Sequence, residues 1–361
     1  MHLLKNACLA LSLLWAAPAA AAVDYAARIE ERDIVLDDFK FGTGETMEEL
    51  RIHVSTLGTP KRDSEGRVTN AVMVLHGTGG SGHSFLRPQF ADELFGPGQP
   101  LDIGRYYIIL PDNIGHGKSS KPSDGLKMDF PKYDYADMIE AQRRMLVEGL
   151  KVDRLRLMFG TSMGCMHGFM WGQRWPDFVQ AMMPMACLPV EIAGHNRMWR
   201  KAVIEGIKAD PAWQGGNYET QPVMGLRVGA SLLQVVGAAP LYLQKEYDTR
   251  EEADAYIVER ISASIEGLDA NDMIYQFDSS RNYNPWPGLE KITTPMTWIN
   301  SSDDVINPWD YGIAEKAAAR MPNARYVLIK ATDETRGHST HSWAKFWKQE
   351  LIDLLARTEA K

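Results

Sequence analysis

Short runs of apolar residues alternate along this chain with longer segments in which apolar residues recur at helical spacing. We expect strands at eight of the short runs, which occupy residues 33–39, 50–56, 71–75, 106–110, 155–159, 181–186, 296–300 and 325–330. Runs without interruption, such as VMVL and YIIL, suit strands that are buried on both faces. Helix-length segments lie between them at 135–150, 162–175, 309–321 and 342–355. The alternation predicts an α/β protein with a mostly parallel, eight-stranded sheet flanked by helices, in which the first two strands form an antiparallel hairpin.

One long stretch, residues 188–285, breaks this rhythm. It contains no convincing strand, but it carries helical patterns and turn signals such as Asp210-Pro211. We predict that it forms a helical cap inserted between the sixth and seventh strands, because strands on both sides of it are needed to complete the sheet. A separate helical domain is the alternative. With the cap at residues 188–285, the core domain is predicted to consist of residues 23–187 and 286–361.

The first 22 residues read as a targeting segment rather than as part of the fold. Lys5 precedes an apolar run, and small residues follow it up to Ala22. This layout predicts a secretory signal peptide that is cleaved after Ala22. A membrane anchor is the alternative, but the apolar run is shorter than the ~20 residues that a span needs. We therefore expect a periplasmic or secreted protein with no membrane span in its mature chain.

The charge and the cysteine content of the chain exclude further classes of protein. Among 361 residues, 39 are Lys or Arg and 47 are Asp or Glu, which gives a net charge of −8. An acidic chain without runs of basic residues is a poor match for nucleic acid or for anionic membranes. Beyond the predicted signal peptide only Cys165 and Cys187 remain, too few for a disulfide framework. The sequence leaves open whether they pair, and whether the protein is a monomer or a homodimer.

The sequence GTSMG, residues 160–164, matches the pattern G-x-S-x-G. It directly follows the apolar run LRLMF and opens a helical segment, which is the strand–turn–helix context of a nucleophile elbow. The two glycines allow the sharp turn from which the hydroxyl of Ser162 would project. A glycine-rich loop around a buried serine is the alternative. We predict that Ser162 is a nucleophile.

A serine nucleophile needs a base, and the base needs an orienting acid. Two later strands end in suitable segments, SSDDVINP after MTWIN and GHSTH after RYVLIK. We predict Asp303 as the acid. It is followed by one residue, then by two apolar residues and, at short distance, by a proline. Asp304 is the alternative. We predict His338 as the base, because it comes first after the strand, whereas His341 is expected to enter the last helix.

The segment HGTGG, residues 76–80, follows the third strand and can supply part of an oxyanion hole. The backbone amides of Thr78 and Met163 would face the developing alkoxide. A phosphate-binding loop is the alternative, but the lysine and the glycine spacing of such loops are missing. His338 and His341 lack a third metal ligand. We therefore expect neither a cofactor nor a metal.

The segments HGTGG, PDNIGHGKS, GTSMG, SSDDVINP and GHST occur in the order typical of the α/β-hydrolase superfamily. Further segments, AQRRMLVEGLKVDRL, SMGCMHGFMWGQRWPDFV, IKADPAWQGGNYETQPVMGL and DANDMIYQFDSSRNY, resemble the homoserine O-acetyltransferase-like branch of it. The resemblance implies an α/β-hydrolase fold with a helical cap between strands six and seven, and an acyl-enzyme at Ser162.

Several segments depart from that branch. The loop DNIGHGKSSKP is similar to that of ordinary hydrolases, and GHST replaces the usual GHD. Arg227 falls out of register with the arginine that holds the amino-acid acceptor in the branch. Export would also separate the protein from acyl-coenzyme A. These departures favour water as the acyl acceptor.

We therefore expect a serine hydrolase that cleaves a small-molecule ester, or in second place an amide. An O-acyltransferase of the homoserine O-acetyltransferase type is the alternative. A non-catalytic binding protein of the same fold is the second alternative. Arg197, Arg200 and Arg227 remain open as either surface residues or ligands.

Overall fold

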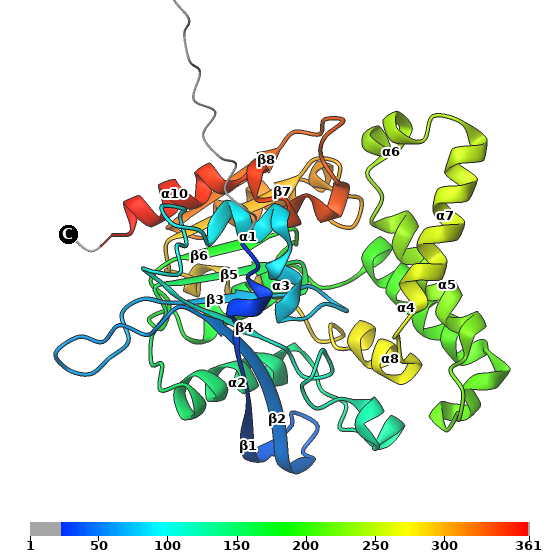
Figure 1. Cartoon of the computed structure of the whole chain (residues 1–361), viewed down its shortest axis with the longest axis horizontal. Helices are drawn as coiled ribbons and strands as arrows, with labels where there is room; N and C mark the ends of the chain where they lie inside the picture. Colours follow the sequence, from blue (N-terminus) through cyan, green and yellow to red (C-terminus); the bar gives the residue numbers. More distant parts are fainter. Residues whose placement is uncertain (1–22, 360–361) are drawn as a thin grey trace, which may run out of the picture.

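The computed structural model describes residues 23–359, which form a twisted eight-stranded sheet with helices on both faces and a helical cap at one side (Figure 1). The strands are β1 (Glu30–Lys40), β2 (Thr46–Leu57), β3 (Ala71–Leu75), β4 (Tyr107–Pro111), β5 (Leu157–Thr161), β6 (Met182–Met185), β7 (Met296–Ser301) and β8 (Ala324–Ile329). Their order across the sheet is β1-β2-β4-β3-β5-β6-β7-β8. The strands from β3 to β8 pair in parallel, whereas β2 is antiparallel to both of its neighbours. The mostly parallel sheet and the N-terminal hairpin are thus confirmed. The predicted signal peptide lies outside the described residues.

Two apolar layers cover the sheet. On one face, α1 (Pro88–Leu94) and α10 (Lys348–Arg357) pack against the strands. On the other face lie α2 (Tyr135–Arg144), α3 (Met163–Arg174) and α9 (Ile313–Ala318). Successive residues of β3 contribute to opposite layers: Val72 and Val74 to the first, Met73 and Leu75 to the second. A central strand covered on both sides needs apolar residues at every position, which explains the uninterrupted run there.

The cap is inserted between β6 and β7, as predicted. It contains α4 (Gly194–Ala209), α5 (Val223–Val236), α6 (Pro240–Glu246), α7 (Arg250–Ile265) and α8 (Ala270–Asp278). Helices α4, α5 and α8 enclose an apolar core of their own, formed mainly by Trp199, Val203, Ile207, Leu226, Met273 and Phe277. The carboxylate of Asp272 on α8 accepts hydrogen bonds from the backbone N–H and the hydroxyl of Ser123, at 2.8 and 2.6 Å. This contact ties the cap to a loop of the core domain.

Three local predictions need correction. Helix α1 has no counterpart among the predicted segments. The predicted helix at 309–321 is divided into a 3₁₀ turn (Trp309–Tyr311) and α9, because Gly312 between them adopts a left-handed conformation with φ of +61°. His341 does not enter the last helix: it lies in a 3₁₀ turn (Gly337–Ser342) that also holds His338, and α10 begins only at Lys348. The extended backbone of Trp343, with φ of −109° and ψ of 90°, ends that turn.

Within residues 23–359, no single helix combines the length and the apolar character that a membrane span requires. Helices α5 and α6 have the required length and apolar character only when they are counted together. The chain bends by 98° between them.

Candidate active site

Ser162 lies at a sharp turn between β5 and α3. Its backbone has φ of +52° and ψ of −108°, a strained conformation for a residue with a side chain. Both flanking glycines are required by close contacts. A Cβ atom at position 160 would lie 2.2 Å from the carbonyl oxygen of Gly164, and one at position 164 would lie 2.2 Å from that of Leu75. The G-x-S-x-G pattern therefore has the structural basis that the sequence predicts.

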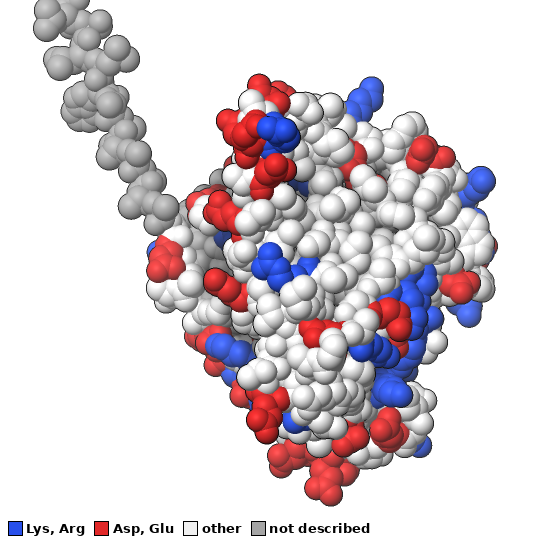
Figure 2. Space-filling model, turned by 90° about the vertical axis from the view of Figure 1, so that its right-hand side faces the viewer, with Lys and Arg blue, Asp and Glu red and all other residues white. Residues whose placement is uncertain are grey.

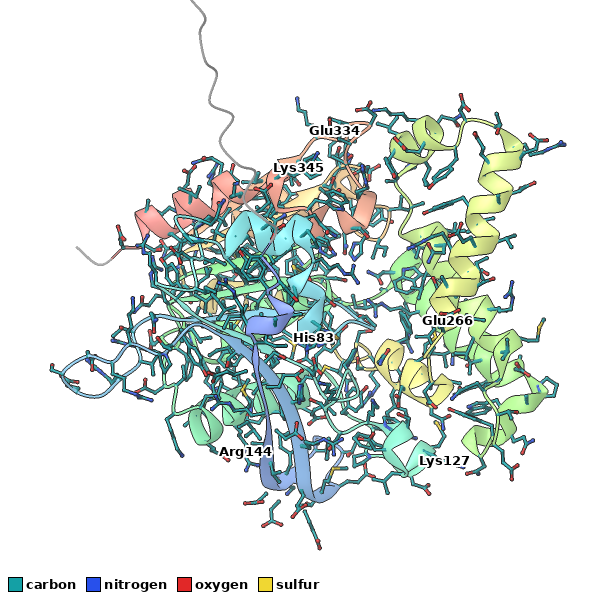
Figure 3. All side chains as sticks on the ribbon, in the orientation of Figure 1. His83, Lys127, Arg144, Glu266, Glu334 and Lys345 are labelled. Carbon is teal, nitrogen blue, oxygen red and sulfur yellow. A yellow bond between two sulfur atoms is a disulfide. The ribbon has the colours of Figure 1, made fainter. Side chains whose placement is uncertain are left out.

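The predicted base contacts the predicted nucleophile. Nε2 of His338 lies 2.9 Å from Oγ of Ser162, although 176 residues separate them in the sequence. His338 is positioned by the loop that follows β8, where Gly337 has φ of +54° and packs against the cap at Ala238. A salt bridge of 2.8 Å between Glu334 and Lys345 joins the two sides of this loop (Figure 3).

The carboxylate that contacts His338 belongs to Asp304 and not to Asp303, the residue that the sequence analysis favoured. Oδ2 of Asp304 lies 2.8 Å from Nδ1 of His338, and the side chain of Asp304 is only 1% exposed. Its Oδ1 accepts the backbone N–H groups of Ile306 and Asn307, at 2.9 and 3.2 Å. Burial would raise the pKa of the Asp304 carboxyl, but the His338 imidazole and Asn307 together hold this pKa below its ordinary value.

Asp303 has a different set of partners. Its Oδ2 accepts the hydroxyl of Thr335 at 2.6 Å and the backbone N–H of Gly337 at 3.1 Å, and its Oδ1 accepts the hydroxyl of Ser301. Asp303 therefore anchors the loop that carries His338 rather than the imidazole itself. The spacing of the residues after the strand could not distinguish the two, because neighbouring side chains in this turn point in different directions.

Asn307 is a further residue of the site that the sequence analysis missed. Its Nδ2 donates to Oδ2 of Asp304 at 3.0 Å and to the carbonyl of Ala186 at 3.0 Å. It thereby holds the carboxylate against the end of β6. The available signal was an asparagine three residues after an aspartate, a spacing typical of a turn closed by side-chain hydrogen bonds.

The glycine-rich segment after β3 lies directly against the nucleophile. A Cβ atom at position 77 would lie 3.2 Å from Cβ of Ser162. The carbonyl of His76 accepts the backbone N–H of Gly164 at 3.1 Å, which joins this segment to α3. Thr78 directly follows Gly77, and Met163 directly follows Ser162, so each residue predicted to supply an oxyanion amide is next in sequence to one of these two contacting residues.

His76 orders this segment through a buried hydrogen-bond network. Its Nε2 accepts the backbone N–H of Asn113 at 3.1 Å, so the proton resides on Nδ1, which donates to the carbonyl of Gly77 at 2.8 Å. Burial lowers the pKa of His76, which keeps the ring neutral and this arrangement intact.

His341 lies beside His338 in the same 3₁₀ turn. Its ring centroid lies 5.4 Å from that of His338, and burial, with a further effect of His338, lowers the pKa of His341 to about 3. Among the described residues, no group of three or more His, Cys, Asp or Glu side chains is arranged to hold a metal ion.

Cys165 and Cys187 form a disulfide, which the sequence left open. Cys165 lies in the first turn of α3, three residues after Ser162, and Cys187 follows β6; their Cα atoms are 5.9 Å apart. The bond links the helix that begins at the nucleophile to the neighbouring strand.

A cluster of buried polar side chains lies beyond the glycine-rich segment. Tyr135, the first residue of α2, is adjacent to Thr78 and Ser280 and to Arg200 of the cap. Burial raises the pKa of the Tyr135 phenol and lowers the pKa of the Arg200 guanidinium. The sequence analysis left Arg200 open, although it shares one helical face with the buried Val203, Ile204 and Ile207.

Comparison with known proteins points to one family. The family model for the alpha/beta hydrolase fold matches residues 70–335. A homoserine O-acetyltransferase from Solidesulfovibrio magneticus is 32% identical over 253 residues, which are 60% of this chain and 62% of that relative. The chain thus matches less than two thirds of the length of that relative.

Two solved structures share the fold. The homoserine O-acetyltransferase from Bacillus anthracis superimposes with a TM-score of 0.80 at 20% identity, covering 92% of this chain and 99% of that one. The acetyl esterase MekB superimposes with a TM-score of 0.79 at 21% identity, covering 91% of this chain and 97% of that one.

Proposed function

This chain belongs to the alpha/beta hydrolase fold family, and we propose that it is a serine-dependent acyl-transfer enzyme that moves an acyl group from an ester onto the hydroxyl of a small alcohol. The observation that carries the acyl-enzyme part of the proposal is the continuous hydrogen-bonded chain from Ser162 through His338 to Asp304. Relatives that are named homoserine O-acetyltransferase support a hydroxyl group, rather than water, as the acceptor.

In the first half of the proposed reaction, the hydroxyl of Ser162 attacks the ester carbonyl while Nε2 of His338 takes its proton. Asp304 orients the imidazole and stabilises the cation that forms. The carbonyl oxygen becomes an oxyanion, which the backbone N–H groups of Met163 and Thr78 would stabilise. The carbon–oxygen bond to the leaving alcohol then breaks, His338 returns the proton to that alcohol, and the acyl group remains on Ser162.

In the second half, the acceptor hydroxyl gives its proton to Nε2 of His338 and attacks the acyl carbonyl. The bond to Ser162 breaks, and the proton returns to the serine oxygen. The result is one new ester and an unchanged enzyme. Water in the place of the acceptor would release the free acid by the same steps.

Hydrolysis is the second candidate, because the acyl-enzyme is common to both outcomes. The segment DNIGHGKSSKP after β4 and the position of Arg227, which differ from the transferases, favour it. An acceptor must outcompete ~55 M water, and it can do so only if the site binds and orients it. The distinction therefore depends on groups around Ser162 rather than on the hydrogen-bonded chain itself.

The proposed location is the periplasm or the exterior of the cell. The disulfide between Cys165 and Cys187 supports an oxidising compartment, in agreement with the signal peptide expected at residues 1–22. In such a compartment the acyl donor would be another ester rather than a coenzyme thioester. Fractionation of cells and N-terminal sequencing test this: we expect a mature chain that starts at Val23.

The proposed activity is tested by product partitioning. The mature enzyme is given 4-nitrophenyl acetate together with millimolar serine, homoserine or ethanol, and O-acetyl product and free acetate are quantified by mass spectrometry. We expect O-acetyl product to exceed acetate with at least one acceptor. Acetate alone with every acceptor would favour the hydrolase.

Ser162→Ala is the control for both candidates. The substitution should lower kcat by several orders of magnitude in a folded protein. Turnover that is unchanged in this variant would rule out both reactions at Ser162.

A further inference from the structure

Arg200, on α4 of the cap, is a charged side chain in an unusual place. It is only 2% exposed. Its Nε donates to Oδ1 of Asn196 at 2.8 Å, and its guanidinium lies 4.7 and 6.0 Å from the rings of Trp199 and Phe277. Its Nη1 is buried and has no hydrogen-bond partner within residues 23–359, nor does a carboxylate of that part form a salt bridge with it. Burying a charge without a counterion costs free energy, so the position of Arg200 suggests that its guanidinium pairs with a bound anion.

Arg200 is two side chains away from the nucleophile. It lies beside Tyr135, and Tyr135 lies beside Thr78. Thr78 in turn follows Gly77, which packs against Ser162. The hydroxyls of Thr78 and Tyr135 are also buried. The Tyr135 hydroxyl faces Thr78, Ser280 and Arg200, but within residues 23–359 none of these contacts has good hydrogen-bond geometry. Three buried polar groups thus lead from the segment beside Ser162 to the guanidinium.

The chemistry of these donors suits one class of group. A guanidinium presents a planar pair of N–H donors that matches a carboxylate, and the neighbouring hydroxyls can donate to the same oxygens. A single positive charge balances one carboxylate. The other arginine on this helix, Arg197, already has a counterion, because its Nη2 lies 3.2 Å from Asp278.

The charge around α4 also favours an anion. Lys132, Lys201, Lys208 and Arg281, together with the acidic Asp278, line a separate cleft of about 210 Å³ beside this helix, which Arg200 itself does not line. On the face of the molecule that includes the cap, Lys and Arg side chains gather at one margin of a largely uncharged surface (Figure 2). These basic side chains are a local excess in a chain whose net charge is −8. Such an excess would raise the concentration of small anions beside α4.

We propose that Arg200, together with Tyr135 and Thr78, binds a substrate carboxylate beside Ser162, so that the enzyme prefers esters that carry a carboxylate. The inference rests on the proposed function, since it takes acyl transfer at Ser162 as given. The carboxylate belongs either to the acyl part or to the alcohol part of the ester, and matched substrates separate the two.

Two pairs of esters test the proposal. In the first pair, 4-nitrophenyl hydrogen succinate and its methyl ester differ by a carboxylate in the acyl part. In the second, 4-acetoxybenzoate and its methyl ester differ by a carboxylate in the alcohol part. For each pair the preference is the ratio of the two kcat/KM values, measured with the wild-type enzyme, Arg200→Met and Arg197→Met. The same substitution one turn earlier on α4 makes Arg197→Met the matched control.

We expect the wild-type enzyme to prefer the charged member of one pair by about tenfold or more. Arg200→Met should reduce that preference to about twofold or less, and Arg197→Met should retain it. The pair of esters for which this preference is lost in Arg200→Met shows whether the carboxylate belongs to the acyl part or to the alcohol part. A preference that is absent from both pairs in the wild type, or that survives in Arg200→Met, would overturn the proposal.

Arg200→Lys provides a second variant in case the methionine variant does not fold. It keeps the charge but loses the planar pair of donors, so it should show an intermediate preference; a preference equal to that of the wild type would contradict the proposed pairing. Failure of the proposed function would be seen separately, as turnover of the uncharged esters that persists in Ser162→Ala.

Discussion

At the scale of single residues, two adjacent carboxylates perform different tasks. Asp304 contacts the imidazole of His338, whereas Asp303 accepts hydrogen bonds from the loop that carries this histidine. The sequence predicted Ser162 and His338, which the structure brings into contact, because a G-x-S-x-G turn and a histidine after a strand are local signals. It could not select the acid, because the choice depends on the direction of each side chain in a turn closed by Ile306 and Asn307.

Asparagine substitutions distinguish the roles of the Asp303 and Asp304 carboxylates. We expect Asp304→Asn to lower kcat by about 10³- to 10⁴-fold, because the imidazole loses the partner that fixes its tautomer. Asp303→Asn keeps an oxygen that can accept hydrogen bonds, so its loss of kcat should stay within about tenfold. Both are measured with 4-nitrophenyl acetate on variants whose folding is checked by circular dichroism. The reverse order of effects would return the role of the acid to Asp303.

The pH dependence of the rate follows from His338 and Asp304. Since the pKa of Asp304 is held below its ordinary value, this carboxylate stays ionised when the medium becomes mildly acidic. Only a neutral imidazole can take the serine proton, so kcat/KM should fall toward acid pH. The measurement is a profile of kcat/KM from roughly pH 5 to 8. A flat profile would be inconsistent with His338 as the base.

At the scale of elements, the apolar pattern was enough to predict the sheet and the place of the cap. Each of the eight strands overlaps a predicted run, and β3 coincides with one. The pattern missed α1, which has only seven residues and begins at a proline. It also left Arg200 open, although helical spacing places this residue on the buried face of α4. A charged residue on an apolar face was the signal, but only the fold shows that Arg200 lies beside Tyr135, which in turn lies beside Thr78.

The disulfide joins two of these elements, and its contribution to stability can be measured. Cys165 and Cys187 are separated by 22 residues. Closing a loop of this size in the unfolded chain stabilises the fold by about 3 kcal/mol. We expect the double variant Cys165→Ala/Cys187→Ala to lose a free energy of unfolding of that order in urea titrations. A stability equal to that of the wild type, with the native protein shown to contain no free thiols, would argue against this estimate.

At the scale of the whole molecule, several histidines are buried in the neutral form. Burial lowers the pKa of His167 to about 3, and it does the same for His341. In the unfolded chain these rings have their ordinary value of 6.5. The unfolded state therefore binds more protons below about pH 6.5, so stability is complete above that pH and decreases as the pH falls.

His167→Gln tests this linkage. Between pH 7.5 and 5.5, one such histidine lowers the free energy of unfolding by about 1.4 kcal/mol. The variant should lose less stability over this interval than the wild type does, by about that amount. His195→Gln is the control, because His195 is exposed, and it should leave the pH dependence unchanged. An identical pH dependence in His167→Gln would contradict the neutral, buried state of His167.

The central claim is that Ser162 carries the acyl group, and covalent labelling tests it most directly. The mature enzyme is treated with a fluorophosphonate, and its peptides are mapped by mass spectrometry. We predict a single adduct on Ser162, which forms much more slowly in His338→Ala and does not form in Ser162→Ala. An adduct on another residue, or ester turnover that continues while Ser162 remains unlabelled, would contradict the account.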